Sequence, residues 1–158
     1  MPRVDDKDRE LLRILRENGR ITLTELGKLL NLSPASVKNR LEKLERLGAI
    51  RGYSAVVDPA FLDEFISALL SLRFEHFDEA LRIELRKVAS LKNVEFLYVK
   101  TGDYQVIMKA TFEDMDALRR FIERLKALFG RNLKFIEVNL IEEELKDCWV
   151  AYEEASRH

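Results

Sequence analysis

The sequence predicts an α+β protein, with a helical N-terminal third followed by a segment whose strands and helices alternate in the order β-α-β-β-α-β. Two observations lead to this prediction. Apolar residues recur at helical spacing on both sides of a break at residues 31–34. From Phe65 to Phe74 they alternate, so that one side of the segment is wholly apolar, as in a strand.

The composition is that of an ordinary folded protein. The chain has 158 residues, enough for one large domain or two small ones, and no apolar run long enough to span a membrane. It is charged from the third residue onward, so we expect no signal peptide, no membrane partner and a cytoplasmic location. The single cysteine, Cys148, excludes an internal disulfide and a multi-cysteine zinc site, and we expect it to be a small buried apolar side chain.

Capping signals divide the first part of the chain into three helices. Each begins at a side chain that can accept a free backbone N–H, and the expected N-caps are Asp5 or Asp6, Thr22 or Thr24, and Ser33. Pro34 then occupies the first position of the third helix, where no N–H is needed. Asn18-Gly19 ends the first helix and Gly48 ends the third.

The second and third helices have the marks of a helix-turn-helix. Gly27 lies one turn before the break, where closely crossing helices leave no room for a side chain, and Asn31 tolerates the left-handed conformation of a tight turn. Two helices of an all-α bundle would show the same apolar stripe. The small residue, the left-handed turn residue, the Ser-Pro start and the small polar residues on the first exposed turn together favour the helix-turn-helix over that alternative. The stripe of the third helix is Val37, Leu41 and Leu44, and the opposite face carries Ala35, Ser36, Asn39, Lys43 and Arg46.

In this motif the N-terminal part of the second of its two helices, here the third helix of the chain, enters the major groove of double-stranded DNA. Ser36 and Asn39 are our candidates for base edges, and Ala35 is the candidate for a thymine methyl. Residues 49–53 are expected to form a short extended wing, whose Arg51 either reaches a phosphate or is solvated. The basic candidates for phosphate on the helix are Lys38, Arg40 and Lys43, and the complete predicted DNA-facing set is Ser33, Ala35, Ser36, Lys38, Asn39, Arg40, Lys43 and Arg51.

Charge is distributed unevenly along the chain. Residues 1–58 hold 12 basic and 9 acidic side chains, a balance of +3, whereas residues 59–158 have a balance of −4. The segment 33–51 alone has five basic and two acidic residues. This excess suits phosphate contact, although charged runs are also common on ordinary surfaces.

The sequence character changes after a short linker. We predict a helix-turn-helix DNA-binding domain at 1–53, a linker at 54–63, and a dimerisation and effector-sensing domain at 64–158. The expected later elements are a helix at 78–90, strands at 94–100 and 104–112 joined by Gly102-Asp103, a helix from Asp114 to Gly130, and a strand at 133–141. With right-handed crossovers this order gives a ferredoxin-like sheet with both helices on one face. Residues 142–158 read as a helix or as a strand around 148–152.

The second face of this sheet is not cleanly polar. Phe65 and Leu69 fall opposite the Ile66 side of their strand, and the segment 96–99 is apolar on both sides. A half-solvated antiparallel sheet should alternate more sharply. We therefore predict a homodimer through this face, with a cover made by the chain's own tail as the alternative.

The whole chain resembles the Lrp/AsnC, or feast/famine, family of transcriptional regulators. The resemblance rests on DDKDRELLRILRENGR, on LTELGKLLNLSPASVKNRLEKLERLGAIRGYSAVVDP and on TGDY. It implies a dimer, often assembled into octamers or fibres, that binds operators and frequently senses amino acids at contacts between dimers. It also implies that Arg40 is the arginine typical of the family's third helix, and that the C-terminal domain is the family's RAM-type domain.

The TGDY segment matches the effector loop of that family. Gly-Asp is also a good two-residue hairpin turn, so the motif contacts a ligand or simply joins two strands. Family members often have an acidic residue after the tyrosine, where this chain has Gln105, which leaves Asp103 as the carboxylate for an ammonium group. The effector-binding candidates are Thr101, Gly102, Asp103, Tyr104, Arg131 and Asn132.

Two other functions fit the same architecture. Siroheme decarboxylases look like this family in both domains, but the only histidines are His76 and His158, and no nucleophile-base pair or metal-ligand spacing is present. We therefore expect no catalytic residue, metal or cofactor. The other alternative is an architectural protein that binds DNA without sequence preference.

Overall fold

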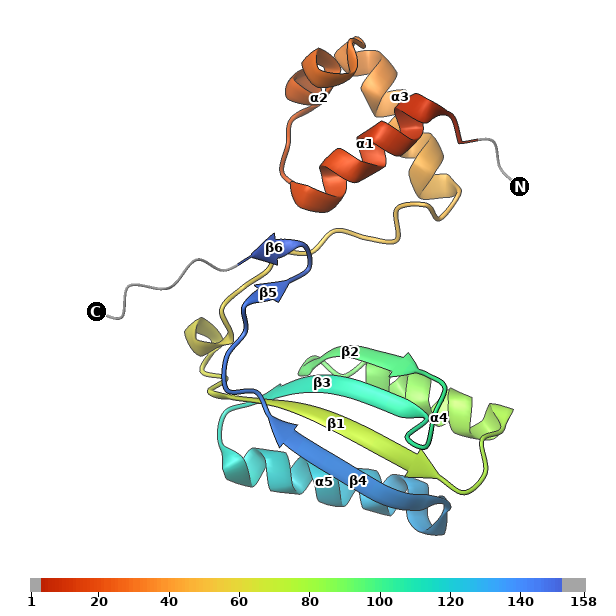
Figure 1. Cartoon of the computed structure of the whole chain (residues 1–158), viewed down its shortest axis with the longest axis vertical. Coiled ribbons are helices and arrows are strands. Elements are labelled where there is room, and N and C mark those ends of the chain that lie inside the picture. The colour runs from red at the N-terminus through yellow and green to blue at the C-terminus, as the bar shows by residue number, and fades with distance from the viewer. Residues whose placement is uncertain (1–3, 152–158) are drawn as a thin grey trace. The chain divides into compact units, whose positions relative to one another are not determined.

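The computed structural model describes residues 4–151 and divides the chain into two compact units. Among these residues, the helical unit comprises 4–56 and 145–151, and the sheet unit runs from Val57 to Glu144 (Figure 1). This division groups residues 145–151 with the helices, whereas the predicted third segment runs from 64 to 158. None of the helices among the described residues has the length and apolar character needed to cross a membrane.

The helical unit contains α1 (Asp6–Glu17), α2 (Leu23–Leu30) and α3 (Pro34–Arg46). The predicted N-caps are confirmed as Asp5, Thr22 and Ser33, whose side chains accept N–H groups of the first turns. Pro34 is the first residue of α3, as predicted. Five wholly buried apolar side chains form the core: Leu11, Leu26, Leu30, Val37 and Leu44.

The turn between α2 and α3 has the predicted geometry. Asn31 is left-handed, with φ of 54°. A Cβ built on Gly27 would lie 2.5 Å from the carbonyl oxygen of Leu32, which is closer than real carbon atoms approach. The glycine therefore allows the backbone after the turn to cross directly over α2.

Gly27→Ala is expected to destabilise the helical unit by about 2 kcal/mol or more, even though alanine is the better helix former by about 1 kcal/mol. The added methyl must displace backbone, because the atom that it meets is a carbonyl oxygen. Denaturant unfolding followed by circular dichroism measures the change. Gly19→Ala is the matched control, since its Cβ would meet nothing closer than 3.9 Å; equal stability of the two variants would contradict this account of the turn.

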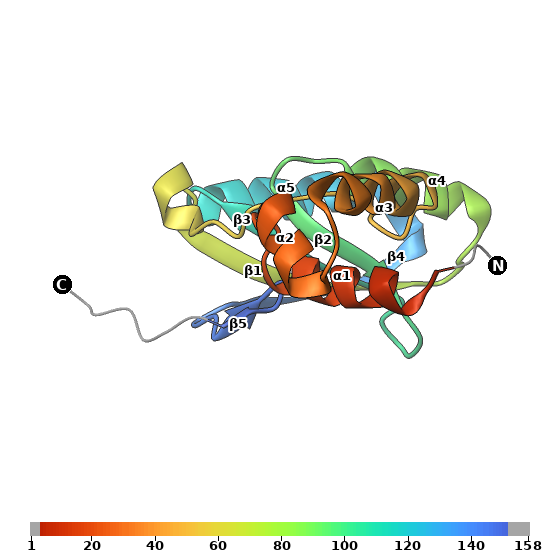
Figure 2. The same cartoon turned by 90° about the horizontal axis from the view of Figure 1, so that it is seen from above.

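The sheet unit has the predicted β-α-β-β-α-β order. Its elements are β1 (Ile66–Phe74), α4 (Glu79–Ala89), β2 (Val94–Val99), β3 (Val106–Phe112), α5 (Met115–Phe129) and β4 (Leu133–Leu140). The strands are antiparallel in the order β2-β3-β1-β4, and α4 and α5 cover the same face (Figure 2). Short 3-10 turns lie at Pro59–Leu62 and Gly130–Asn132. The ferredoxin-like α+β prediction is confirmed.

Side chains from every second position of the strands fill the space between sheet and helices. Leu70 and Leu72 of β1 and Val106 and Met108 of β3 are wholly buried there. Asp78 and Asp114 cap α4 and α5, and Gly130 follows the end of α5. The apolar alternation that predicted β1 therefore marks the covered face of the sheet.

Three local predictions are wrong. Residues 49–53 form no strand, so the expected wing is an irregular segment. The β2–β3 connection is longer than a two-residue turn, because strand pairing stops at Val99 and Val106 and the Lys100 N–H donates to the Gln105 carbonyl at 2.8 Å. Cys148 is exposed rather than buried.

The C-terminal segment is a short hairpin instead of the helix or longer strand considered above. Strands β5 (Lys146–Asp147) and β6 (Val150–Ala151) pair across a two-residue turn. Both turn residues are left-handed, with φ of 42° at Cys148 and 69° at Trp149. The expected end of the alternative strand, Tyr152, lies outside the described residues.

Candidate DNA interface and ligand region

The N-terminal half of α3 presents the predicted small and polar residues to solvent. Ala35, Lys38 and Asn39 are exposed and Ser36 is half-buried, while Val37 and Leu44 of the same helix have no exposed surface. The orientation of α3 follows from its apolar stripe, which must pack against the core of the helical unit and so leaves the opposite face of the helix to solvent. The exposed face is the predicted reading surface.

Ser33 has a defined local role at the start of this surface. Its Oγ accepts the Ser36 N–H at 3.1 Å, which fixes the first turn of α3. The side chain of Lys38 extends into solvent, 64% exposed, with Glu42 Oε1 at 3.9 Å. A pair this exposed contributes little to stability, so Lys38 is available to another anion.

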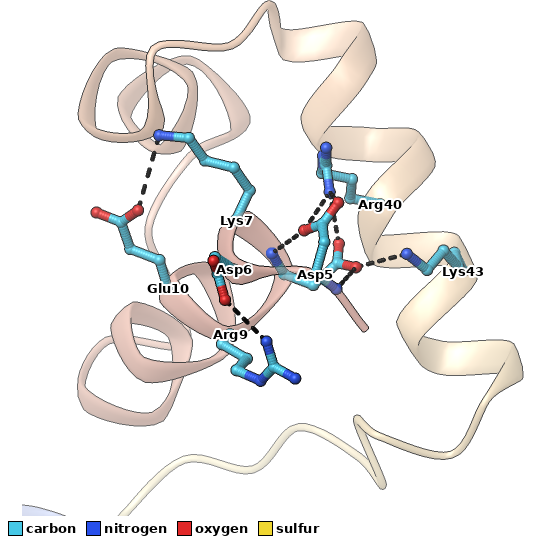
Figure 3. Close-up of polar contacts among 8 residues, drawn as sticks. Asp5, Asp6, Lys7, Arg9, Glu10, Arg40 and Lys43 are labelled. Carbon is cyan, nitrogen blue, oxygen red and sulfur yellow. Dashed lines mark hydrogen bonds and ion pairs between the residues drawn. The ribbon is translucent and has the colours of Figure 1, made fainter. Parts of the chain in front are cut away.

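Arg40 and Lys43 have partners inside the protein that the sequence did not reveal. Arg40 Nη1 donates to the Asp5 carboxylate at 2.7 and 2.8 Å and to Asp8 Oδ1 at 2.8 Å. Lys43 Nζ donates to Asp8 Oδ2 at 2.5 Å. Figure 3 shows both basic side chains of α3 reaching across to the first turn of α1. We call these four residues the α1–α3 ion cluster.

Asp8 is the centre of the α1–α3 ion cluster. It has no exposed surface, and its carboxylate also accepts the Asp5 N–H at 3.1 Å in a capping box. Burial alone would raise the pKa of Asp8, but hydrogen bonds from Lys43, the Asp5 backbone and Arg40 outweigh it and lower that pKa to about 2. The hydrogen bond from Arg40 likewise lowers the pKa of Asp5. Both carboxylates are therefore charged at neutral pH.

Arg51 lies in the irregular segment after α3. Its neighbour Tyr53 is held by a hydrogen bond of 2.8 Å from its hydroxyl to Glu45 Oε1. Burial and this carboxylate raise the pKa of Tyr53. The Arg51 side chain is exposed and forms no ion pair among residues 4–151.

The structure brings the effector candidates to one end of the sheet. Thr101 to Tyr104 lie in the loop before β3, and Arg131 and Asn132 lie in the turn before β4. Because β3 and β4 both pair with β1, these two segments flank the end of β1 near Phe74 (Figure 1). The two segments are about thirty residues apart in the sequence, and the antiparallel pairing of β3 and β4 with β1 brings them to the same end of the sheet.

Two polar side chains in this region form hydrogen bonds with backbone groups. The Gln105 amide donates to the Phe74 carbonyl at 3.2 Å and accepts the Phe74 N–H at 2.9 Å. The Asn132 amide donates to the His76 carbonyl at 2.9 Å and accepts the His76 N–H at 2.8 Å. Thr101, Gly102, Asp103 and Arg131 are exposed, whereas Tyr104 is half-buried. Asn132 therefore holds the backbone of His76, which follows β1, through two hydrogen bonds. The exposed loop residues remain the more accessible candidates for effector binding.

The sheet face away from α4 and α5 carries apolar side chains. Phe96 and Tyr98 of β2 stack with ring centres 4.9 Å apart, and Tyr98 is 60% exposed. Phe135 of β4 is 52% exposed, with the Arg73 guanidinium 4.0 Å from its ring centre. Exposed aromatic groups on one face of a sheet are typical of an interface.

One lysine on that face is buried. Lys109 of β3 is 7% exposed and pairs with Glu95 at 2.8 Å and Glu144 at 2.5 Å. Burial alone would lower the pKa of Lys109, but these two carboxylates outweigh it and raise that pKa above its usual value. The lysine stays charged, and the segment after β4 is tied to the sheet through Glu144.

Asp8 and Trp149 are the important residues that the sequence reasoning missed. Asp8 lies in the first turn of α1, and its partners come from a helix more than thirty residues away. Trp149 lies in a turn that carries neither glycine nor asparagine, so no turn signal marked it. No residue near Asp8 in the sequence marks its partners, because Arg40 and Lys43 come from another helix.

Comparisons with known proteins agree on one kind of protein. Residues 4–45 match the model of the AsnC-type helix-turn-helix domain, and residues 60–134 match that of the Lrp/AsnC ligand binding domain. The chain is 41% identical to an uncharacterized HTH-type transcriptional regulator of Pyrococcus furiosus over 93% of this chain and 96% of that protein. It is 32% identical to the leucine-responsive regulatory protein of Escherichia coli over 82% and 80% of the two chains.

Solved structures show the same likeness. A transcriptional regulator from Neisseria meningitidis, crystallised as a complex with L-Met, superimposes with a TM-score of 0.75 at 27% identity, over 92% of this chain and 94% of that one. An AsnC family transcriptional regulator from Agrobacterium tumefaciens gives a TM-score of 0.75 at 25% identity, over 91% and 94% of the chains. These relatives are named as regulators of transcription.

Proposed function

The chain belongs to the Lrp/AsnC family of transcriptional regulators, and from this premise we propose that it reads a specific operator as a homodimer, through the N-terminal turns of α3. One observation carries the proposal. The small and polar side chains at positions 35, 36 and 39 point away from the core that Val37 and Leu44 fill. A helix presented in this way fits the major groove.

The burial and contacts of the α3 side chains support different roles for different residues of this helix. We assign base contacts to Ser36 and Asn39, a thymine methyl contact to Ala35, and phosphate contacts to Lys38. We assign Arg40 and Lys43 to holding α3 against α1, since their cationic groups already lie on Asp5 and Asp8. This changes the predicted role of these two residues from phosphate binding to positioning.

Asn39→Ala is expected to reduce the preference for the operator over a scrambled duplex by about tenfold or more, because a good side-chain contact to a base edge contributes roughly 1–3 kcal/mol of discrimination. Lys38→Ala is the contrasting variant, and it should weaken binding to both duplexes about equally. The operator is first selected from random DNA with the full-length protein, and affinities are then measured by fluorescence anisotropy at fixed salt. Equal losses on both duplexes for Asn39→Ala would contradict the base-reading assignment.

We infer that the second subunit covers the aromatic face of the sheet. Tyr98 and Phe135 are more than half exposed there in the single chain. The alternative cover, the chain's own tail, accounts for only part of this face: Glu144 pairs with Lys109 there, whereas the described residues 145–151 group with the helical unit. Two helical units in one dimer can then read a pseudo-palindromic site.

We also propose that a small molecule, an amino acid or a related compound, binds at Thr101–Tyr104 with Arg131 nearby. The matched ligand binding domain and the L-Met complex of the Neisseria meningitidis regulator support this proposal. Asp103 is the carboxylate of the loop and is exposed. A carboxylate there can pair with an ammonium group.

Asp103→Asn is expected to abolish stabilisation by an amino-acid effector, because the amide keeps the shape of the loop and removes its charge. A thermal-shift screen of the wild-type protein against the amino acids identifies the ligand, and the variant is then measured with that ligand. Asp63→Asn, at another exposed aspartate of the sheet unit, is the control. Unchanged stabilisation in Asp103→Asn would remove this carboxylate from the site.

A further inference from the structure

A cavity lies within the helical unit, on the side of α1 that faces the chain after α3. Its volume is about 500 Å³, and its walls come from the second half of α1, residues 49–53 and Trp149. Pockets for small ligands fall in this size range, about 300–1,000 Å³. Leu12, Leu15 and Ile50 supply an apolar floor.

Three arginines line this cavity and no acidic residue does. They are Arg13, Arg16 and Arg51. Among residues 4–151 none of the three forms an ion pair with a carboxylate, in contrast to Arg40, which has two carboxylate partners. Guanidinium groups stay charged at any pH at which the protein is folded, so the cavity carries uncompensated positive charge.

Two aromatic side chains stand beside these arginines. Trp149 is 55% exposed and Tyr53 is 59% exposed, although both belong to the cavity wall. The Arg16 guanidinium lies 3.9 Å from the centre of the Trp149 ring. Tyr53 is fixed by its hydrogen bond to Glu45. The wall therefore offers two flat apolar ring surfaces next to cations, and more than half of each of these side chains is open to solvent.

The turn that presents Trp149 is conformationally costly. Cys148 and Trp149 both have positive φ. In this left-handed region the backbone of residues other than glycine and asparagine is strained by about 1 kcal/mol or more each. A turn of this kind is ordinarily filled by Asn-Gly. Strain of this sort is common where a side chain is placed for binding, and here it places the indole over Arg16.

We propose that this cavity binds a small anion that carries a planar ring, with the size and chemistry of a nucleoside monophosphate or an aryl phosphate. The anionic group lies among Arg13, Arg16 and Arg51, where guanidinium groups can hold it by paired hydrogen bonds. The ring packs against Tyr53 and Trp149. The site is separate from the loop at 101–104, which belongs to the sheet unit.

The protein contains its own reporter for this site, because Trp149 is the only tryptophan in the chain. The full-length protein without DNA is titrated with adenosine monophosphate and with phenyl phosphate, and tryptophan emission is recorded. Adenosine tests the ring without the charge, and inorganic phosphate tests the charge without the ring. We expect a saturable change with at least one ring-bearing anion, and binding at least tenfold weaker for adenosine and for inorganic phosphate.

Arg51→Ala is expected to weaken this binding at least tenfold, since it removes one of the three cations from an exposed irregular segment and leaves the core intact. Arg9→Ala is the matched control on α1, because Arg9 pairs with Asp6 at 2.9 Å and does not line the cavity. Isothermal titration calorimetry repeats the comparison without the fluorophore. No saturable binding of either anion, or an equal loss in both variants, would overturn the proposal. Neither result bears on DNA recognition by α3.

Discussion

Asp8→Ala is expected to lower the free energy of unfolding of the helical unit by about 3 kcal/mol, the largest single effect on stability that we predict. Removing one partner of a buried ion pair typically costs about 3–5 kcal/mol, because the remaining charge has lost its compensation. The lower end applies here, since Arg40 and Lys43 are 24% and 33% exposed and can turn partly to water. Denaturant unfolding of the full-length protein, followed by circular dichroism, measures the change.

Acid titration of the same proteins identifies the cause. The pKa of Asp8 falls from 3.8 to about 2 on folding, so its contribution, about 2 kcal/mol, is complete above about pH 5 and is lost as the pH falls through about 2. The wild-type protein should therefore lose more stability than Asp8→Ala over this range. Asp6→Ala is the control, because Asp6 pairs only with the exposed Arg9 in the described structure. Parallel pH profiles for wild type and Asp8→Ala would contradict the ion-cluster account.

Tyr98→Glu is expected to convert the proposed dimer into single chains of 18.5 kDa at micromolar concentration and to weaken operator binding by about a hundredfold or more. The side chain is 60% exposed in one chain, so the charge costs the isolated fold little. In the proposed dimer the same charge would be buried without a partner. Loss of the second helical unit removes half of the DNA contacts.

Sedimentation velocity measures the assembly state, and anisotropy measures DNA binding on the same samples. Leu128→Glu is the matched control, because Leu128 is 46% exposed on α5, away from the aromatic face. It should leave both assembly and DNA binding unchanged. If wild-type protein sediments as one chain, or if Tyr98→Glu stays dimeric, the second subunit does not cover this face.

Local signals were enough to predict most of the fold. Ser33 and Asp114 lie where a helix must satisfy free N–H groups, and Asn31 lies where the turn must become left-handed, so each is readable from a few neighbouring residues. The alternation of β1 is equally local. Antiparallel pairing and the two crossover helices then leave few other topologies.

The features that could not be predicted from the sequence are those that depend on residues far apart in the chain. Nothing near Arg40 shows that its cationic group is committed to Asp5 and Asp8, because packing of α1 against α3 decides it. The cavity around Arg13 and Arg51 likewise depends on a hairpin from the other end of the chain. Burial of Cys148 was expected from its residue type, but a two-residue turn places it at the surface.

Photo-crosslinking from position 39 tests the central claim, that the exposed turns of α3 read bases. A photoreactive amino acid replaces Asn39 in the full-length protein, and another replaces Glu17, which is exposed at the end of α1. Each protein is irradiated on the selected operator, and the crosslinked nucleotide is mapped. We predict a crosslink from position 39 to a base within each half-site and none from position 17. Absence of any crosslink from position 39 on a bound operator would contradict the account.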